Sequence, residues 1–80
     1  MKATEQKLKQ VLADQLDIPV ESVGENTSPD TVPTWDSMHH LRLVLALENA
    51  FDVSLTEEQV VEVMNYPLIK IVLQELGVEF

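Results

Sequence analysis

Hydrophobic residues recur every three or four positions in several stretches of the chain, which is the spacing of one face of an α-helix. The first stretch holds Leu8, Val11, Leu12 and Leu16. It stops before Pro19, whose ring removes a backbone donor and cannot continue a helix. We therefore predict a first amphipathic helix that ends near Leu16.

The most apolar stretch begins after Asp36 and predicts a second helix that ends near Phe51. Asp36 is a suitable N-cap because its short carboxylate can accept hydrogen bonds from the free amides of the first turn, which places Ser37 at the first helical position. The predicted inward face, widened by Leu43 and Ala46, consists of Met38, Leu41, Val44, Leu45, Leu47 and Phe51.

Two further helices follow. Thr56 and Gln59 have the spacing of a capping box, which predicts a short third helix through Val60, Val61 and Met64. Pro67 is placed near the start of a fourth helix, and Gly77 near its end. No strand alternation is visible, so the fold class is all-α: a four-helix bundle with a short third helix.

The connection from Asp17 to Trp35 is long and rich in proline, yet it contains apolar residues that can pack on the core: Ile18, Val20, Val23 and Val32. Long loops inside small proteins are usually functional or folded back on the core. We interpret this one as a structured link within one domain that covers residues 1–80.

Composition and charge reduce the number of function classes that fit the chain. Eighty residues leave little room for both a core and a catalytic cleft. Fourteen acidic against five basic side chains give a net charge of −9, which disfavours nucleic acid and favours basic protein surfaces, although acidic charge also serves solubility. The chain lacks cysteine and any apolar run of membrane-spanning length, so we expect a cytoplasmic protein whose thiol chemistry, if any, is supplied by an added group.

Ser37 is the focal residue, since it opens a helix directly after a long loop. Free backbone amides and the positive end of the helix dipole favour an anion there, such as a phosphodiester on the serine. The alternative is that Asp36 and Ser37 form only a capping pair.

The segment Asp36-Ser37-Met38, followed by an amphipathic helix that ends in Leu47-Glu48-Asn49-Ala50-Phe51-Asp52-Val53, resembles the modification site and second helix of acyl carrier proteins. The resemblance extends to the order of elements over nearly the whole chain. It implies a 4'-phosphopantetheine arm on Ser37, attached from coenzyme A by a separate phosphopantetheinyl transferase that uses magnesium, with Asp36 helping to position the metal and the transferase. Such a protein is a non-catalytic carrier of acyl thioesters for fatty-acid, polyketide or related biosynthesis.

The resemblance also implies partners and a cavity. The partners are acyl-loading, elongating or transferring enzymes, and we expect the carrier to be monomeric. The predicted partner interface comprises Met38, His39, Arg42, Glu48, Glu57, Glu58 and Glu62. Candidates to line a cavity that shelters a chain, or simply to fill the core, are Val44, Leu45, Val60, Val61, Met64 and Ile69.

Two departures from the family pattern point to a specialised, freestanding carrier, with excision from a larger synthase left open. The upper turns of the second helix hold His39, His40 and Arg42 where acidic residues are usual, and Trp35 precedes the site where glycine is frequent. The carried group stays open between a long acyl chain, a short one and an aminoacyl group.

Three other interpretations compete with the carrier. A hydrolase would use Ser37 as nucleophile and His40, one turn on, as base, but the chain lacks a nucleophile-elbow signature. The spacing of the candidate ligands argues against metal binding. His39 and His40 are adjacent on a helix and so point to different sides. The segment from Asp52 lacks the glycine and the closing glutamate of a calcium loop. The remaining alternative is an acidic helical interaction module that is never modified.

Overall fold

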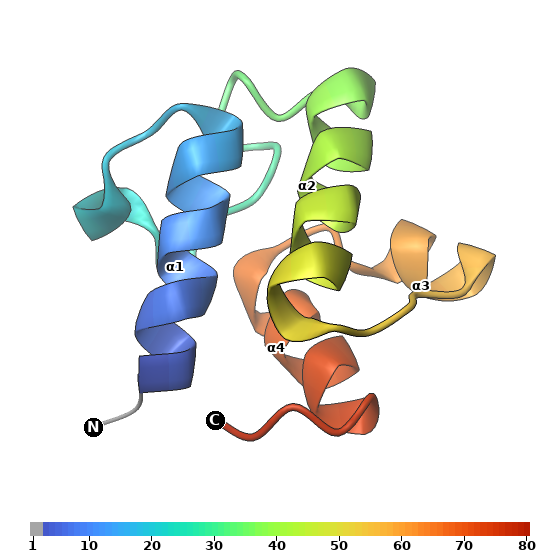
Figure 1. Cartoon of the computed structure of the whole chain (residues 1–80). Helices are drawn as coiled ribbons and strands as arrows, with labels where there is room; N and C mark the ends of the chain where they lie inside the picture. The colour runs from blue at the N-terminus through green and yellow to red at the C-terminus, as the bar shows by residue number, and fades with distance from the viewer. Residues whose placement is uncertain (1–2) are drawn as a thin grey trace.

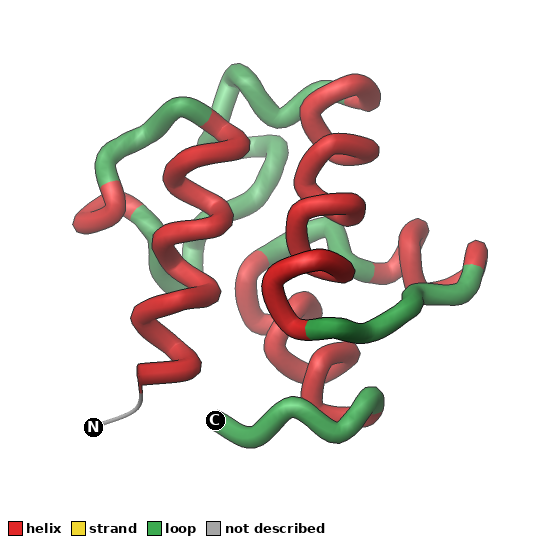
Figure 2. The backbone as a smooth tube through the Cα atoms, in the orientation of Figure 1, coloured by secondary structure: helices red, strands yellow, loops and turns green. Residues whose placement is uncertain are grey.

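The computed structural model describes residues 3–80, and this part of the chain is helical with no strand (Figures 1 and 2). The elements, in order, are α1 (Ala3–Leu16), the 3₁₀-helix η1 (Val20–Ser22), α2 (Ser37–Phe51), α3 (Glu57–Glu62) and α4 (Tyr66–Glu75). The prediction of an all-α bundle with a long connection before α2 and a short third helix is confirmed.

Capping side chains set the start of the last three helices. The Asp36 carboxylate accepts a hydrogen bond from the His39 amide at 2.9 Å, and the Asn65 side chain accepts from the Leu68 amide at the same distance. Thr56 and Gln59 form the reciprocal capping box that their spacing predicts. The third helix is shorter than predicted, because it ends at Glu62 and leaves Met64 beyond it.

Two aspartates and one glycine end helices in the left-handed conformation. Asp17 follows α1 with φ 59°, Asp52 follows α2 with φ 56°, and Gly77 comes after α4 with φ 100°. Aspartate tolerates this conformation better than most residues, and it lets the next amide turn back to the helix. Accordingly, the Ile18 amide donates to the Ala13 carbonyl and the Val53 amide to the Glu48 carbonyl, each at 3.1 Å.

Helices α1, α2 and α4 build the core, with α1 lying beside α2 (Figure 1). Complete burial of a leucine side chain contributes about 1.5–3 kcal/mol, so a few such residues account for much of the driving force. The most deeply buried side chains are Leu8, Leu12, Leu16, Leu43, Leu47, Val63, Ile69 and Leu73.

The predicted inward face of α2 is partly wrong. Leu43, Val44 and Leu47 face the core, whereas Met38, Leu41 and Leu45 are about 60% exposed. Seven of the first eleven residues of α2 are Leu, Val, Ala or Met, so the hydrophobic pattern covers more of the helix than one face. Packing within the bundle buries Leu43 and leaves a stripe of apolar side chains in solvent.

The connection from α1 to α2 is fixed by side chains from both of its halves. Val23, Val32 and Trp35 are buried, and the Thr34 hydroxyl donates to the Leu16 carbonyl at 2.6 Å. The carbonyl of the buried Thr27 accepts from the Tyr66 amide at 3.0 Å, which ties the loop to α4. The prediction of a structured link is therefore confirmed. These contacts fix Trp35 and Asp36 in place at the start of α2.

Candidate functional site

Ser37 is the first residue of α2, and its side chain is exposed. Asp36 before it is extended (φ −106°, ψ −173°), and its backbone carbonyl accepts from the His40 amide at 2.8 Å to start the helix. Trp35, one residue earlier, is only 4% exposed. The buried indole therefore anchors the end of the loop while the serine hydroxyl two residues later remains accessible.

The Asp36 carboxylate makes two contacts through the same oxygen. Its Oδ1 accepts from the His39 amide at 2.9 Å and lies 2.8 Å from Nδ1 of the His39 ring. These hydrogen bonds, the amide first and the ring second, hold the pKa of Asp36 below its usual value. The side chain is still 64% exposed, so Asp36 presents a charged carboxylate to solvent beside Ser37.

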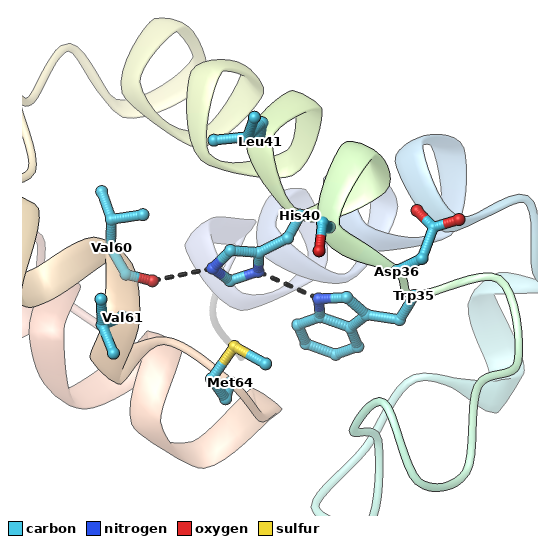
Figure 3. A pocket seen from close by; sticks show the side chains of 8 residues that line it. Trp35, Asp36, His40, Leu41, Val60, Val61 and Met64 are labelled. Carbon is cyan, nitrogen blue, oxygen red and sulfur yellow. Dashed lines mark hydrogen bonds between the residues drawn. The ribbon is translucent and has the colours of Figure 1, made fainter.

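A groove of about 570 Å³ lies next to Ser37, between the first turns of α2 and the end of α3 (Figure 3). Its size is that of a small-ligand site, and most of the side chains around it are apolar. The residues that line it are Trp35, Asp36, Ser37, His40, Leu41, Val60, Val61 and Met64.

The predicted cavity residues divide into three groups. Val60, Val61 and Met64 line the groove as predicted. Val44 and Ile69 are buried in the core instead, and Leu45 is exposed farther along α2. Sequence reasoning missed Trp35, His40 and Leu41 as lining residues. The one available signal was Trp35, since a large aromatic residue directly before the Asp36-Ser37 pair could have indicated a buried side chain beside the site.

His40, unexplained by the sequence, joins three parts of the chain. Its Nδ1 accepts from the Trp35 indole Nε1 at 3.0 Å, and its Nε2 lies 2.7 Å from the Val60 carbonyl oxygen. The two ring planes differ by 23°, and their centroids are 6.1 Å apart. Both ring nitrogens of His40 already have partners, so the ring is not available as a base for Ser37. The hydrolase interpretation therefore lacks its general base.

The predicted interface residues lie on α2 and α3, and none of them lines the groove itself. Met38 is 62% exposed, and the Arg42 guanidinium reaches its sulfur at 3.9 Å. Three of the acidic residues, Glu57, Glu58 and Glu62, are exposed on α3. Glu48 differs, because its Oε2 accepts from the Leu55 amide at 2.8 Å and so holds the turn after α2.

The residues at the start of α2 fit a phosphodiester on Ser37. The hydroxyl is exposed, it stands at a helix N-terminus whose dipole favours negative charge, and an apolar groove adjoins it. Within residues 3–80, no three His, Cys, Asp or Glu side chains gather as a resident metal site requires, and no helix is long and apolar enough to span a bilayer.

Comparison with known proteins identifies the family. No family model matches the chain. Acyl carrier proteins of Buchnera aphidicola subsp. Acyrthosiphon pisum, from the strains Tuc7, 5A and APS, are each 30% identical to it over 59 residues, which is 74% of this chain and 74% of theirs. The chain therefore belongs to the acyl carrier protein family, and a general role as a carrier follows from that membership.

Proposed function

We propose that the protein carries acyl or aminoacyl groups on a 4'-phosphopantetheine arm attached to Ser37 and delivers them to enzymes of fatty-acid, polyketide or related biosynthesis. The observation that carries the proposal is the exposed Ser37 hydroxyl at the first position of α2. When bound, the arm supplies a thiol for thioester linkage, which this cysteine-free chain lacks. The protein itself catalyses no reaction in this proposal, which treats residues 1–80 as one carrier domain.

Asp36 has two roles in the proposal. Through Oδ1 it caps α2 and so fixes the direction in which Ser37 projects. Its exposed, charged carboxylate also helps to position the magnesium ion that the phosphopantetheinyl transferase brings to the site. The carboxylate is ionised at neutral pH as any ordinary aspartate is, and the lowered pKa of Asp36 extends the charged state to more acid pH.

The groove beside Ser37 is proposed to shelter the carried group near its attachment point. Leu41, Val60 and Met64 supply apolar surface there, and Val61 is 72% exposed at the rim. Apolar cargo placed against these side chains loses contact with water, which is favourable in proportion to the area covered.

The proposed partner surface lies on α2 and α3 and has two parts that differ in charge. Met38, His39 and Arg42 form a neutral-to-basic part on the upper turns of α2, and Glu57, Glu58 and Glu62 form an acidic part on α3. Glu48 contributes through the turn that it holds. The net charge of −9 favours enzymes with basic docking surfaces, and the basic upper turn favours specialised partners over those of ordinary fatty-acid synthesis. We propose a cytoplasmic, monomeric, freestanding carrier.

Intact-protein mass spectrometry tests the proposal. The apo-protein is incubated with coenzyme A, magnesium and a broad-specificity phosphopantetheinyl transferase, and we expect a single phosphopantetheine adduct that Ser37→Ala abolishes. Ser54→Ala is the matched control, because Ser54 is also exposed but lies in the turn after α2. Absence of an adduct, or an adduct that persists in Ser37→Ala, contradicts the proposal and favours the unmodified interaction module.

A further inference from the structure

The His40 side chain crosses the space between α2 and α3 (Figure 3). It is joined on one side to the Trp35 indole at the end of the loop and on the other to the Val60 backbone carbonyl on α3. We call these two hydrogen bonds the His40 bridge.

The partners of the His40 bridge define the form of the imidazole. An indole N–H can only donate, so Nδ1 of His40 must carry a lone pair and accept. The proton of the neutral ring is then on Nε2, which donates to the Val60 carbonyl. The bridge is thus fully satisfied only with an uncharged His40 in the Nε2–H tautomer.

The His40 bridge also forms the floor of the groove. Trp35 belongs to the buried core and lines the groove at the same time, and the His40 ring is hydrogen-bonded to its edge. The core next to these residues is closed, since Val44, one turn after His40, is 5% exposed and Val63, three residues after Val60, is 1% exposed. Along α2 the lining runs only from Ser37 to Leu41, which is about 6 Å at the rise of an α-helix.

We propose that the His40 bridge limits the size of the cargo, so that this carrier shelters short or compact acyl groups and leaves the distal part of a long chain in solvent. The inference rests on the proposed function and names its substrate class. His40 acts in it as a positioning residue, because it holds Trp35 and α3 in place.

The physical reason is the cost of opening the floor. A long chain that threads between α2 and α3 has to separate His40 from Val60, and a chain that enters beneath the two rings has to separate His40 from Trp35 as well. Each separation breaks a hydrogen bond, and the second leaves an indole N–H without a partner in a residue that is only 4% exposed. Additional methylenes must outweigh both losses before they stabilise the bundle.

Chain length is the variable to test. The apo-protein is loaded with butyryl-, octanoyl- and palmitoyl-phosphopantetheine by a broad-specificity transferase, and each product is verified by intact mass. Sheltered cargo raises the melting temperature of its carrier. We expect octanoyl to raise Tm relative to the unacylated holo-protein and palmitoyl to add less than about 1 °C more, where one further kcal/mol would add about 4–8 °C.

Trp35 provides a second readout, since it is the single tryptophan of the chain. Its emission spectrum should be the same in the octanoyl and palmitoyl forms of the wild-type protein, because the His40 bridge stays closed in both. A Tm that climbs steadily from butyryl to palmitoyl, or an emission shift specific to palmitoyl, overturns the inference.

Variants of His40 supply the converse test. In His40→Ala the floor can open, so palmitoyl should raise Tm by roughly 4 °C or more above octanoyl. His40→Gln, whose amide can both accept and donate, should restore the limit. Asn49→Ala, an exposed position on the same helix, is the control and should behave as wild type. Equal chain-length responses in wild type and a folded His40→Ala protein also overturn the inference.

The two proposals fail in different ways. A protein that takes no adduct on Ser37 contradicts the proposed function and this inference with it. A protein that loads normally but shelters palmitoyl completely contradicts only the inference. Should His40→Ala not fold, the wild-type series and its Trp35 emission decide the question.

Discussion

The hydroxyl of Tyr66, the first residue of α4, donates a hydrogen bond of 3.1 Å to Oε2 of Glu5 in the first turn of α1. Lys70, one turn farther along α4, places its Nζ 3.1 Å from the same oxygen. The two helices at opposite ends of the sequence are thereby joined at one carboxylate. The hydrogen bond from Lys70 and then that from Tyr66 lower the pKa of Glu5, while burial and the nearby Glu5 raise the pKa of Tyr66.

Replacement of this carboxylate should make stability less dependent on acid pH. Because the folded-state pKa of Glu5 is lowered, its contribution is present above the unfolded value of about 4.3 and is lost as pH falls through the folded pKa. We expect Glu5→Gln to have a lower Tm than wild type at pH 7 and the difference to shrink below about pH 4. Thermal unfolding followed by circular dichroism from pH 7 to pH 3 measures this. Glu75→Gln, at an exposed position of α4, should show no such convergence.

Two leucines of α2 that are two positions apart should respond very differently to truncation. Leu43 is fully buried, so Leu43→Ala should lower the free energy of unfolding by about 2–5 kcal/mol through lost burial and a residual cavity. Leu45 is 60% exposed, so Leu45→Ala should change it by less than about 0.5 kcal/mol. Urea unfolding measures both. Similar losses in the two variants would mean that the hydrophobic periodicity, and not the packing described here, identifies the inward face.

The starts of α2 and α3 could be predicted because they depend on local chemistry. Asp36 and Thr56 with Gln59 lie near amides only a few residues away, so their capping roles follow from spacing in the sequence. The exposed position of Ser37 follows from the same reasoning, since a residue next to an N-cap begins the helix at the end of a loop.

The orientation of α2 and the role of His40 could not be predicted, since both depend on distant parts of the chain. Leu43 is buried and Leu45 exposed once the helices pack together, and the pattern of α2 alone permits either. His40 finds one partner, Val60, twenty positions away on α3. From the sequence alone Glu48 is an ordinary surface carboxylate, yet its side chain accepts a hydrogen bond from the Leu55 amide after the turn. Each of these contacts exists only once the helices have packed.

The two glycines should differ in their tolerance of a side chain. Gly77 adopts φ 100°, where an L side chain is strained, so Gly77→Ala should destabilise the protein by about 1 kcal/mol or more even though the added methyl meets open space. Gly24 also has open space and lies outside the left-handed region, so Gly24→Ala should be neutral or stabilise by up to about 1 kcal/mol. Urea unfolding of the two variants gives the comparison. Equal effects would contradict the left-handed conformation of Gly77.

Substitutions of Asp36 separate its role as a cap from its proposed role in modification. In Asp36→Asn the side-chain oxygen can still accept from the His39 amide, because asparagine caps helices about as well as aspartate. The variant should therefore unfold near the wild-type Tm, whereas Asp36→Ala loses the cap and should unfold at a lower temperature. Both variants lack the carboxylate charge that the proposed magnesium-dependent transfer uses.

Loading kinetics then decide the second role. With coenzyme A, magnesium and a phosphopantetheinyl transferase, the initial rate of adduct formation should fall in Asp36→Asn by on the order of ten- to a hundredfold, the usual effect of removing a group that orients a metal. Asp30→Asn removes an exposed carboxylate from the preceding loop and should load at the wild-type rate, which excludes a general charge effect. If Asp36→Asn loads as fast as wild type, the carboxylate serves only to cap α2, and the transferase recognises Ser37 through other features of the site.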